Sequence, residues 1–355
     1  MKLKILAVED EPLSVETIRK ELVSLGYDWT ICNFSEAQAK IAEISPDIII
    51  LDLILQTESK GEPKAVGVDL FANYIWKEKF CPVAVYSAQP QELECKHPFV
   101  GNVSKGMGSE KELIKVIKNF IPHIELLRKV EENVRQSFAL AMRNVAPLAF
   151  SATSDSVKQT ELIDRSGRRY LAAYMDESVH GCLFCWEQYI LPPISKDVLL
   201  GDIIMENGMA KDDPASFRVV LTPSCDMVKT HGRTPTQKVL VAQCCNPKHG
   251  KQKAPSAFKD KEALVGVLNQ GYTQRILFLP AYPDNIPLMV ADLKQLDFVS
   301  IDNIANDNSK KYMRVASIDS PYRELVAWAY LQVSCRPGLP ERDCSLLAQE
   351  ILRAC

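Results

Sequence analysis

The sequence predicts an α/β protein in three parts: a doubly wound, five-stranded parallel sheet in residues 1–122, a long helical linker in residues 123–148, and a β-rich α+β domain in residues 149–355. Over the first 120 residues short apolar runs alternate with amphipathic stretches, which is typical of a parallel sheet with helices on both faces. Apolar residues then recur at helical spacing to about residue 145, and beyond residue 150 short β-prone runs are separated by turn residues.

The sheet of the first part is expected to contain five strands joined by helices. The expected strands are residues 3–8, 29–32, 47–51, 83–86 and 100–104. The expected helices are residues 13–25, 35–44, 68–78 and a last one that begins at residue 109. The stretch between Ser87 and Lys105 is short and contains Pro90 and Pro98, so it is not expected to form a complete fourth helix.

The helix that begins at residue 109 carries a heptad pattern. With Ile117 placed at position a, nine of the ten a and d positions as far as Leu148 are apolar. This pattern predicts either a signalling helix that forms a homodimer or a linker helix that packs on its own domain. Pro122 suits the first turn of a second helix and would kink a continuous one. The a positions are Ile117, Ile124, Glu131, Phe138 and Val145, and the d positions are Phe120, Leu127, Val134, Ala141 and Leu148.

The third part is expected to be a strongly bent sheet or a small barrel that ends in a helix. The helix is expected over residues 322–333, after Pro321, because the apolar residues there have helical spacing. Residues 250–261 are polar and basic and are expected to form an exposed loop. The expected strands are residues 169–174, 182–191, 198–205, 217–222, 238–243 and 275–279.

Composition argues against several classes of protein. The chain has 355 residues, of which 46% are hydrophobic and 25% charged, and these are ordinary values for a globular protein. A net charge of −3 gives no electrostatic basis for nucleic acid as a partner. No stretch is apolar and long enough to span a membrane, and acidic residues from Glu9 onward argue against a signal peptide. Eleven cysteines without a secretion signal indicate a reducing compartment, so a cytoplasmic location is expected.

Five chemically active side chains follow strands of the predicted parallel sheet. Glu9 and Asp10 come directly after the first strand, and Asp52 comes after the third. Ser87 follows the fourth strand and Lys105 follows the fifth. Because the carboxyl ends of parallel strands meet at one edge of a sheet, we expect these side chains to converge there. Three carboxylates this close repel one another unless a hard cation lies among them, and Mg²⁺ prefers oxygen ligands. A carboxylate in such a site can attack phosphorus as a nucleophile and form an aspartyl phosphate.

Four segments around these residues resemble the receiver domain of two-component response regulators, which has a flavodoxin-like fold. They are KILAVEDEP at 4–12, PDIIILDL at 46–53, PVAVYSA at 82–88 and VSK at 103–105. The resemblance covers residues 1–122 and implies a phosphoprotein of signal transduction. Residues 149–355 resemble no helix-turn-helix, cyclase or phosphodiesterase.

In that family, the residue that matches Asp52 accepts a phosphoryl group from a histidine kinase or a phosphotransfer protein. The resemblance implies that Glu9 and Asp10, together with Asp52, hold Mg²⁺. It also implies that Ser87 and Lys105 bind the phosphoryl oxygens, so that they form the catalytic set with Asp52.

Departures from the family pattern indicate a remodelled output face. Gly106 follows Lys105 where the family usually has proline, and Asn102 stands where an aromatic switch residue is expected. The stretch between Asp52 and Gly67 is several residues longer than the family norm. Phosphate acceptance is therefore expected to be retained, while the usual coupling of the site to an outward-facing aromatic ring is not.

The sharpest local feature of the third part is Cys225, in a strand that runs into a turn. Three interpretations are open: a nucleophile assisted by a histidine, a zinc ligand together with the pair Cys182 and Cys185, or a small thiol that fills an apolar β core. The third is expected, because zinc sites of this kind need two Cys-x-x-Cys pairs and the sequence has one. Candidate partners for the other two interpretations are His180, His231, Cys244 and His249.

Three functions are consistent with these features. The first, and the preferred one, is a response-regulator-type protein whose third part signals through contact with another protein. The second is an enzyme in which Cys225 acts under the control of the receiver. The third is a phosphate sink that competes with another receiver, as in a phage-defence operon built from two-component parts.

Overall fold

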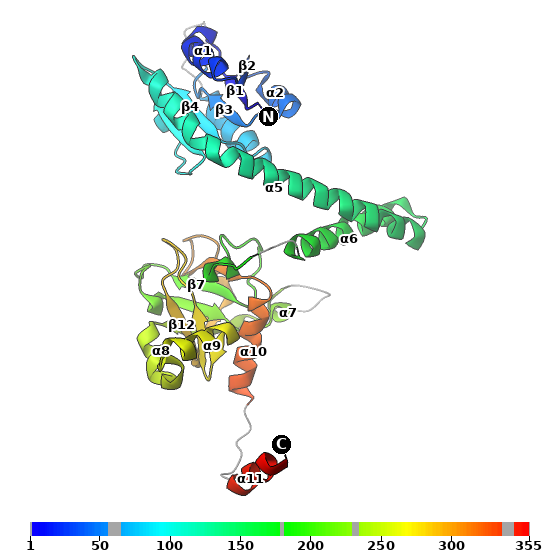
Figure 1. Ribbon diagram of the computed structural model, residues 1–355, viewed down its shortest axis with the longest axis vertical. Helices are drawn as coiled ribbons and strands as arrows, with labels where there is room; N and C mark the ends of the chain where they lie inside the picture. The colour runs from blue at the N-terminus through cyan, green and yellow to red at the C-terminus, as the bar shows by residue number, and fades with distance from the viewer. Residues whose placement is uncertain (1, 56–64, 178–180, 229–233, 336–343, 355) are drawn as a thin grey trace. The chain divides into compact units, whose positions relative to one another are not determined.

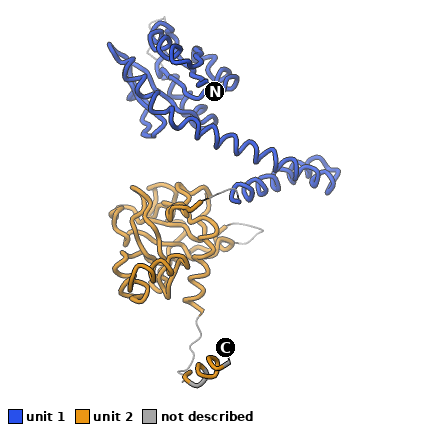
Figure 2. Tube along the Cα trace, viewed as in Figure 1, with its two compact units in different colours: residues 1–180 blue, residues 181–355 orange. Residues whose placement is uncertain are grey.

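The computed structural model describes residues 2–55, 65–177, 181–228, 234–335 and 344–354. The chain divides into two compact units, residues 1–180 and residues 181–355 (Figure 2). The predicted fold class is confirmed, because the structure contains a five-stranded parallel sheet, a long helix and a second, β-rich sheet. The predicted start of the third part at residue 149 falls inside a helix of the first unit.

The first unit is built on a parallel sheet with the strand order β2-β1-β3-β4-β5 (Figure 1). Every residue of β3 is buried, which explains why this strand is an uninterrupted run of isoleucine and leucine in the sequence. The strands are β1 Lys4–Val8, β2 Asp28–Cys32, β3 Ile48–Leu51, β4 Val83–Ser87 and β5 Val100–Ser104.

Helices cover both faces of this sheet, with α1 and α5 in one apolar core and α2 and α3 in the other. Between β4 and β5 the chain forms only a short 3-10 turn, η3 (Pro90–Glu92). The prediction that this stretch does not form a complete fourth helix is therefore confirmed. The other elements are α1 Glu16–Ser24, α2 Ala37–Ile44, α3 Val66–Leu70, the π-helical stretch η2 Phe71–Ile75, α4 Trp76–Glu78 and α5 Ser109–Ala152.

The last of these, α5, is one continuous helix of 44 residues. The predicted linker of residues 123–148 is therefore an extension of the last helix of the sheet unit. Pro122 lies inside this helix and does not begin a second one. Arg128 Nε donates to Asp47 Oδ1 at 2.6 Å, so the helix is tied to the sheet unit several residues beyond the proline.

The predicted heptad seam does not form one surface. Near the sheet, Ile117, Phe120 and Ile124 are buried in the core of the first unit. Farther along, Ala141 and Val145 are buried on the part of α5 that packs against the next helix. The exposed members of the seam are Glu131, Val134, Phe138 and Leu148.

That next helix, α6 (Ser156–Glu177), runs back along α5 after a short connection, and the two form a helical hairpin (Figure 1). The predicted strand over residues 169–174 is therefore wrong. Gly167 lies so close to α5 that a Cβ at this position would be 2.4 Å from Met142 Cε. Packing against α5, together with leucine and alanine in this stretch, stabilises the helix over the strand.

The second unit contains a nine-stranded sheet with the strand order β10-β11-β12-β9-β8-β7-β14-β13, in which β6 also pairs with β14. The predicted strands over residues 217–222, 238–243 and 275–279 are confirmed as β8, β9 and β11. The strands are β6 Tyr189–Ile190, β7 Asp202–Glu206, β8 Phe217–Val220, β9 Lys238–Cys245, β10 Tyr272–Thr273, β11 Ile276–Leu279, β12 Met289–Ser300, β13 Ile304–Ala305 and β14 Tyr312–Ile318.

Two long strands, β12 and β14, were not predicted, because charged residues interrupt their apolar pattern. Asp292 of β12 is fully buried, and its carboxylate accepts a hydrogen bond from Arg275 Nε at 2.6 Å and lies 2.7 Å from His249 Nε2. Arg314 of β14 is also buried, and its Nε donates to Asp202 at 2.8 Å. Both buried charges are thus paired with residues distant in sequence.

The helices of the second unit correct one prediction and confirm another. The predicted loop over residues 250–261 is wrong, because α8 and a 3-10 turn form there and Ala254 and Ala257 are buried. The predicted helix over residues 322–333 is confirmed as α10. Within the described residues, no helix combines the length and apolarity needed to cross a membrane. The helices are α7 Ser224–Met227, α8 Pro247–Lys253, α9 Lys261–Gln270, α10 Tyr322–Ser334 and α11 Ser345–Ala354.

Candidate functional site

The predicted site residues meet at the carboxyl edge of the parallel sheet. Val8 of β1 pairs with Leu51 of β3, so Glu9 and Asp52, the residues that follow them, leave the sheet side by side. Ser87 is the last residue of β4 and pairs with Ser104 of β5. The backbone N–H of Lys105 donates to the carbonyl of Ser87 at 2.9 Å, which fixes the start of the loop after β5.

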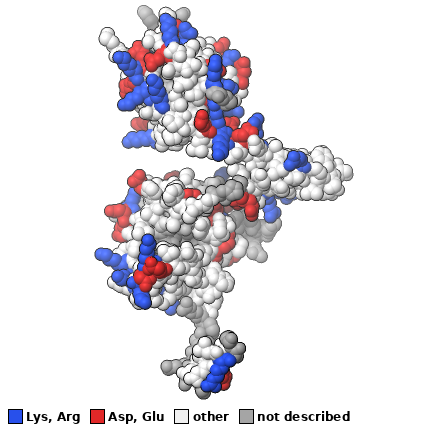
Figure 3. Space-filling model, in the orientation of Figure 1, with Lys and Arg blue, Asp and Glu red and all other residues white. Residues whose placement is uncertain are grey.

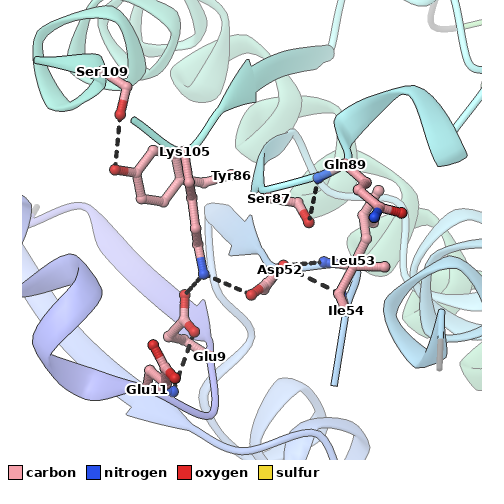
Figure 4. A network of polar contacts seen from close by, with 10 residues as sticks. All are labelled: Glu9, Glu11, Asp52, Leu53, Ile54, Tyr86, Ser87, Gln89, Lys105 and Ser109. Atoms are coloured by element: carbon pink, nitrogen blue, oxygen red, sulfur yellow. Dashed lines mark hydrogen bonds and ion pairs between the residues drawn. The ribbon is translucent and has the colours of Figure 1, made fainter. Parts of the chain in front are cut away.

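Lys105 connects the two buried carboxylates of the site (Figure 4). Its Nζ lies 2.7 Å from Glu9 Oε2 and 2.6 Å from Asp52 Oδ2. The other oxygen of Asp52, Oδ1, accepts hydrogen bonds from the backbone N–H groups of Leu53 at 2.6 Å and Ile54 at 3.2 Å. The carboxylate of Asp52 is therefore held through Oδ1, while Oδ2 faces the ammonium group.

Burial and charge oppose each other in this cluster. Glu9 and Asp52 are only 3% and 6% exposed. Burial raises the pKa of Glu9 above its ordinary value, although the hydrogen bond and the charge of Lys105 act in the opposite direction. Burial alone would lower the pKa of Lys105, but the hydrogen bonds that it donates to Asp52 and Glu9, together with their negative charges, outweigh this and raise the pKa of Lys105. The lysine is therefore firmly cationic and supplies the charge that balances the carboxylates.

The acidic residues fit a hard divalent cation. Ligand oxygens of Glu9, Asp10 and Asp52 all lie within 4.8 Å of one another. Carboxylate oxygens that converge in this way suit Mg²⁺, which prefers oxygen ligands and completes its coordination with water and phosphoryl oxygens. The three residues predicted as metal ligands are thus brought together, and their chemistry is compatible with this ion.

Ser87 is fully buried at the same edge of the sheet. Its Oγ accepts a hydrogen bond from the backbone N–H of Gln89 at 3.5 Å, which leaves the hydroxyl hydrogen available for another acceptor (Figure 4). Asn102, at the position where an aromatic switch was expected, donates from Nδ2 to the carbonyl of Leu93 at 3.5 Å.

Two further residues shape the site and were not predicted from the sequence. The ring of Tyr86 lies 5.7 Å from Lys105 Nζ, and its hydroxyl is 3.0 Å from the Oγ of Ser109, the first residue of α5 (Figure 4). Gly67 lies so close to the backbone of Asp52 that a Cβ at this position would be 2.1 Å from the carbonyl oxygen of Asp52. The signals in the sequence that could have pointed to these two residues are the tyrosine next to Ser87 and the glycine after the long stretch that follows Asp52.

Among the described residues, no cysteine of the second unit belongs to a group placed to hold a metal. Cys182, Cys185 and Cys225 are all exposed, so the prediction that they fill an apolar β core is wrong, and Cys244 alone among those considered is buried. The described part of the chain has one group of three or more His, Cys, Asp or Glu residues placed to hold a metal, the acidic cluster of the first unit. Cys225 Sγ lies 3.6 Å from Asp226 Oδ1. The candidate partners His180 and His231 fall outside the described residues.

Comparison with known proteins found similar solved structures. No protein-family model and no curated protein matches the chain. NtrX from Brucella abortus is 20% identical over 37% of this chain and 29% of its own, with a TM-score of 0.29. The response regulator PhyR from the same organism is 22% identical over 37% of this chain and 52% of its own, with a TM-score of 0.29.

A third similar structure is the N-terminal domain of a response regulator/sensory box/GGDEF 3-domain protein from Carboxydothermus hydrogenoformans. It is 28% identical over 37% of this chain and 98% of its own, with a TM-score of 0.26. The chain thus spans less than a third of the length of NtrX and about half of PhyR. PhyR and the Carboxydothermus hydrogenoformans domain are named as response-regulator proteins, and none of the three structures identifies the C-terminal unit.

Proposed function

We propose that this protein is a response-regulator-type signalling protein that accepts a phosphoryl group on Asp52 from a histidine kinase or a phosphotransfer protein. The observation that carries the proposal is the ammonium group of Lys105, held 2.6 Å from Asp52 Oδ2 and 2.7 Å from Glu9 Oε2 at the carboxyl edge of the sheet. A buried carboxylate beside a fixed cation can receive a dianionic group at that oxygen.

The transfer uses the two oxygens of Asp52 differently. Oδ1 is fixed by two backbone N–H groups, so Oδ2 attacks the phosphorus of the donor phosphohistidine. The new O–P bond forms as the P–N bond breaks, and the departing imidazole retains the electron pair and takes up a proton. Lys105 Nζ and the Ser87 hydroxyl then bind the phosphoryl oxygens. Glu9, Asp10 and Asp52 would hold Mg²⁺, which would supply positive charge to the phosphoryl oxygens.

Incubation with acetyl phosphate or phosphoramidate in the presence of Mg²⁺ tests this proposal. The intact protein should gain the mass of one phosphoryl group, and Asp52→Asn should gain none. Asp28→Asn is the matched control, because Asp28 is an exposed aspartate at the start of β2. Undiminished labelling of Asp52→Asn would place the acceptor elsewhere.

The phosphorylated state can be read by α5 through Tyr86. This tyrosine contacts the Lys105 ammonium with its ring and the first residue of α5 with its hydroxyl. Movement of Lys105 toward a phosphoryl group therefore changes a contact at the start of the long helix. Tyr86→Phe should leave phosphorylation intact and remove the phosphorylation-dependent change in hydrogen exchange at the start of α5. An unchanged response in Tyr86→Phe would exclude this route.

A homodimer through α5 is part of the same proposal. Four apolar residues at intervals of four lie on α5 and are 60%, 52%, 38% and 53% exposed: Leu126, Val130, Val134 and Phe138. Residues 136–154 contain a single charged residue, Arg143, and the end of the hairpin shows few charged side chains on the face drawn in Figure 3. Exposed apolar stripes of this kind are typical of helix-to-helix association.

A phosphate sink, as in a phage-defence two-component system, is the second candidate function. It is favoured by Asn102 at the aromatic switch position and by the 3-10 turn η3 in place of a fourth helix, since both alter the usual output face. In a reconstituted phosphotransfer reaction, a sink lowers the phosphorylation of a second receiver, and Asp52→Asn abolishes the effect. A signalling protein would instead lose its output when the second unit, residues 181–355, is inactivated while phosphorylation persists. An enzyme based on Cys225 has no comparable support, because that thiol is exposed beside a carboxylate.

A further inference from the structure

The second unit has an apolar groove of about 540 Å³ lined by residues of α9, α10 and β11; α9 and α10 are labelled in Figure 1. No charged side chain lines it within the described residues. Its rim is exposed: Leu183, Phe184, Leu268 and Leu288 are 44%, 66%, 46% and 60% accessible. A continuous apolar surface of this kind usually marks a place where another apolar element binds.

The C-terminal helix α11 also carries apolar side chains that are exposed. Ile351 and Leu352 are 53% and 77% accessible. An isolated helix of ten residues is marginal in water, because the cost of helix nucleation is not recovered over so few residues. A helix of this length is stabilised mainly by burying one face against a partner surface.

The connection between the two allows them to meet within one chain. Tyr322 and Leu325, at the start of α10, line the groove, and α10 extends about 20 Å from there to Ser334 at 1.5 Å per residue. The ten residues 335–344 that precede α11 can span at most about 35 Å. The tether is therefore long enough to return α11 to the groove, and a tether this short gives an effective concentration in the millimolar range.

We propose that α11 docks its apolar side chains, including Ile351, into this groove and covers it as an intramolecular cap. The absence of charge on the described lining favours an apolar helix over an anionic ligand. Apolar helix faces bind grooves through anchors one helical turn apart, and a ten-residue helix provides two such turns or more. The cap is independent of phosphate acceptance on Asp52, so either proposal can fail alone.

Hydrogen exchange of the full chain, followed by mass spectrometry of its peptides, tests the cap. The backbone amides of α11 should exchange at least about tenfold more slowly than those of an unstructured peptide of the same sequence. Leu288→Asp, a change at an exposed position on the groove rim, should remove this protection. Ile194→Asp is the matched control, because Ile194 is 83% exposed in the same unit and does not line the groove.

A reciprocal variant gives an independent readout. Ile351→Asp in α11 should uncover the groove and increase the binding of a fluorescent apolar dye several-fold, and Leu288→Asp introduced into that variant should reduce the increase. Amides of α11 that exchange at the unstructured rate, or protection that persists in Leu288→Asp, would overturn the proposal. Protection that rises with protein concentration would assign the groove to α11 of a second copy and would also overturn the intramolecular cap.

Discussion

Replacement of Lys105 by methionine tests how the acidic cluster is balanced. Methionine preserves most of the length of the side chain and removes its charge. Lys105 contributes the ammonium group that lies within hydrogen-bonding distance of both Glu9 and Asp52. In the variant these two buried carboxylates face each other without that cation, and the electrostatic energy of the folded state rises.

The size of the effect follows from burial. Removal of one partner from a buried ion pair costs about 3–5 kcal/mol. The side chain of Lys105 is 21% exposed, so solvent partly screens its charge, and we take the lower end, about 3 kcal/mol. At 1.36 kcal/mol per factor of ten, this corresponds to about a 150-fold increase in the population of the opened state. Mg²⁺ bound among the same carboxylates should restore much of the loss, because binding to the folded state alone stabilises it.

Hydrogen exchange at β1 and β3 measures this effect in the intact chain, where a single unfolding transition is not expected. Without Mg²⁺, amides of these strands in Lys105→Met should exchange about 150-fold faster than in the wild type. With Mg²⁺ the difference should become much smaller. Lys115→Met is the control, since Lys115 is an exposed lysine on α5. The reasoning fails if the acceleration is absent, or if it is the same with and without Mg²⁺.

Three other predictions follow from packing and charge. Gly67→Ala should destabilise the first unit by about 1–3 kcal/mol and reduce phosphorylation of Asp52, because the new Cβ would meet the backbone of Asp52; hydrogen exchange of the first unit and the mass of the phosphorylated protein test this. Val130→Glu combined with Val134→Glu should raise the dimer dissociation constant more than 100-fold, about 3 kcal/mol, and light scattering that finds a wild-type monomer would contradict the dimer. Burial opposes ionisation of Asp292, but hydrogen bonds from its partners outweigh this and lower its pKa. Its contribution to stability is therefore complete above the ordinary pKa of 3.8 and is lost as pH falls through the lowered value. Asp292→Asn should cost about 3 kcal/mol near pH 7 and almost nothing once the wild-type carboxyl is protonated, and equal losses at both pH values would refute the assignment.

The sheet and the acidic site of the first unit could be predicted because their signals are local. The strands β1, β3 and β4 are short, largely apolar runs, and Glu9, Asp52, Ser87 and Lys105 lie at or directly after the ends of strands. Once such strands pair in parallel, Glu9, Asp52 and Lys105 must meet at one edge. The roles of Tyr86 and Gly67 depend on contacts with Ser109 and the backbone of Asp52, and these contacts exist only in the folded chain.

The second unit was harder to predict because distant residues determine its elements. The strand β12 contains Asp292, whose charge is compensated by Arg275 and His249 from other elements. A sequence window around Asp292 therefore contains a polar residue where the sheet is buried. A similar effect acts in the first unit, where residues 169–174 of α6 were predicted as a strand but form a helix because α6 packs against α5. Cys182 and Cys185 lie in an exposed stretch for which the apolar neighbours had suggested a strand.

The continuity of α5 fixes how the hairpin is oriented about the helix axis. The helix is held to the sheet unit as far as Arg128, and the part that packs against α6 begins near Ser137. Each residue inserted between these positions turns everything beyond it by about 100° and advances it by about 1.5 Å. Two inserted residues would carry the hairpin to the opposite side of the helix, whereas seven would return it to within about 20° of its original direction. Natural or engineered variants in which this segment differs in length should therefore retain the direction of the hairpin only when the difference is close to a whole number of helical turns.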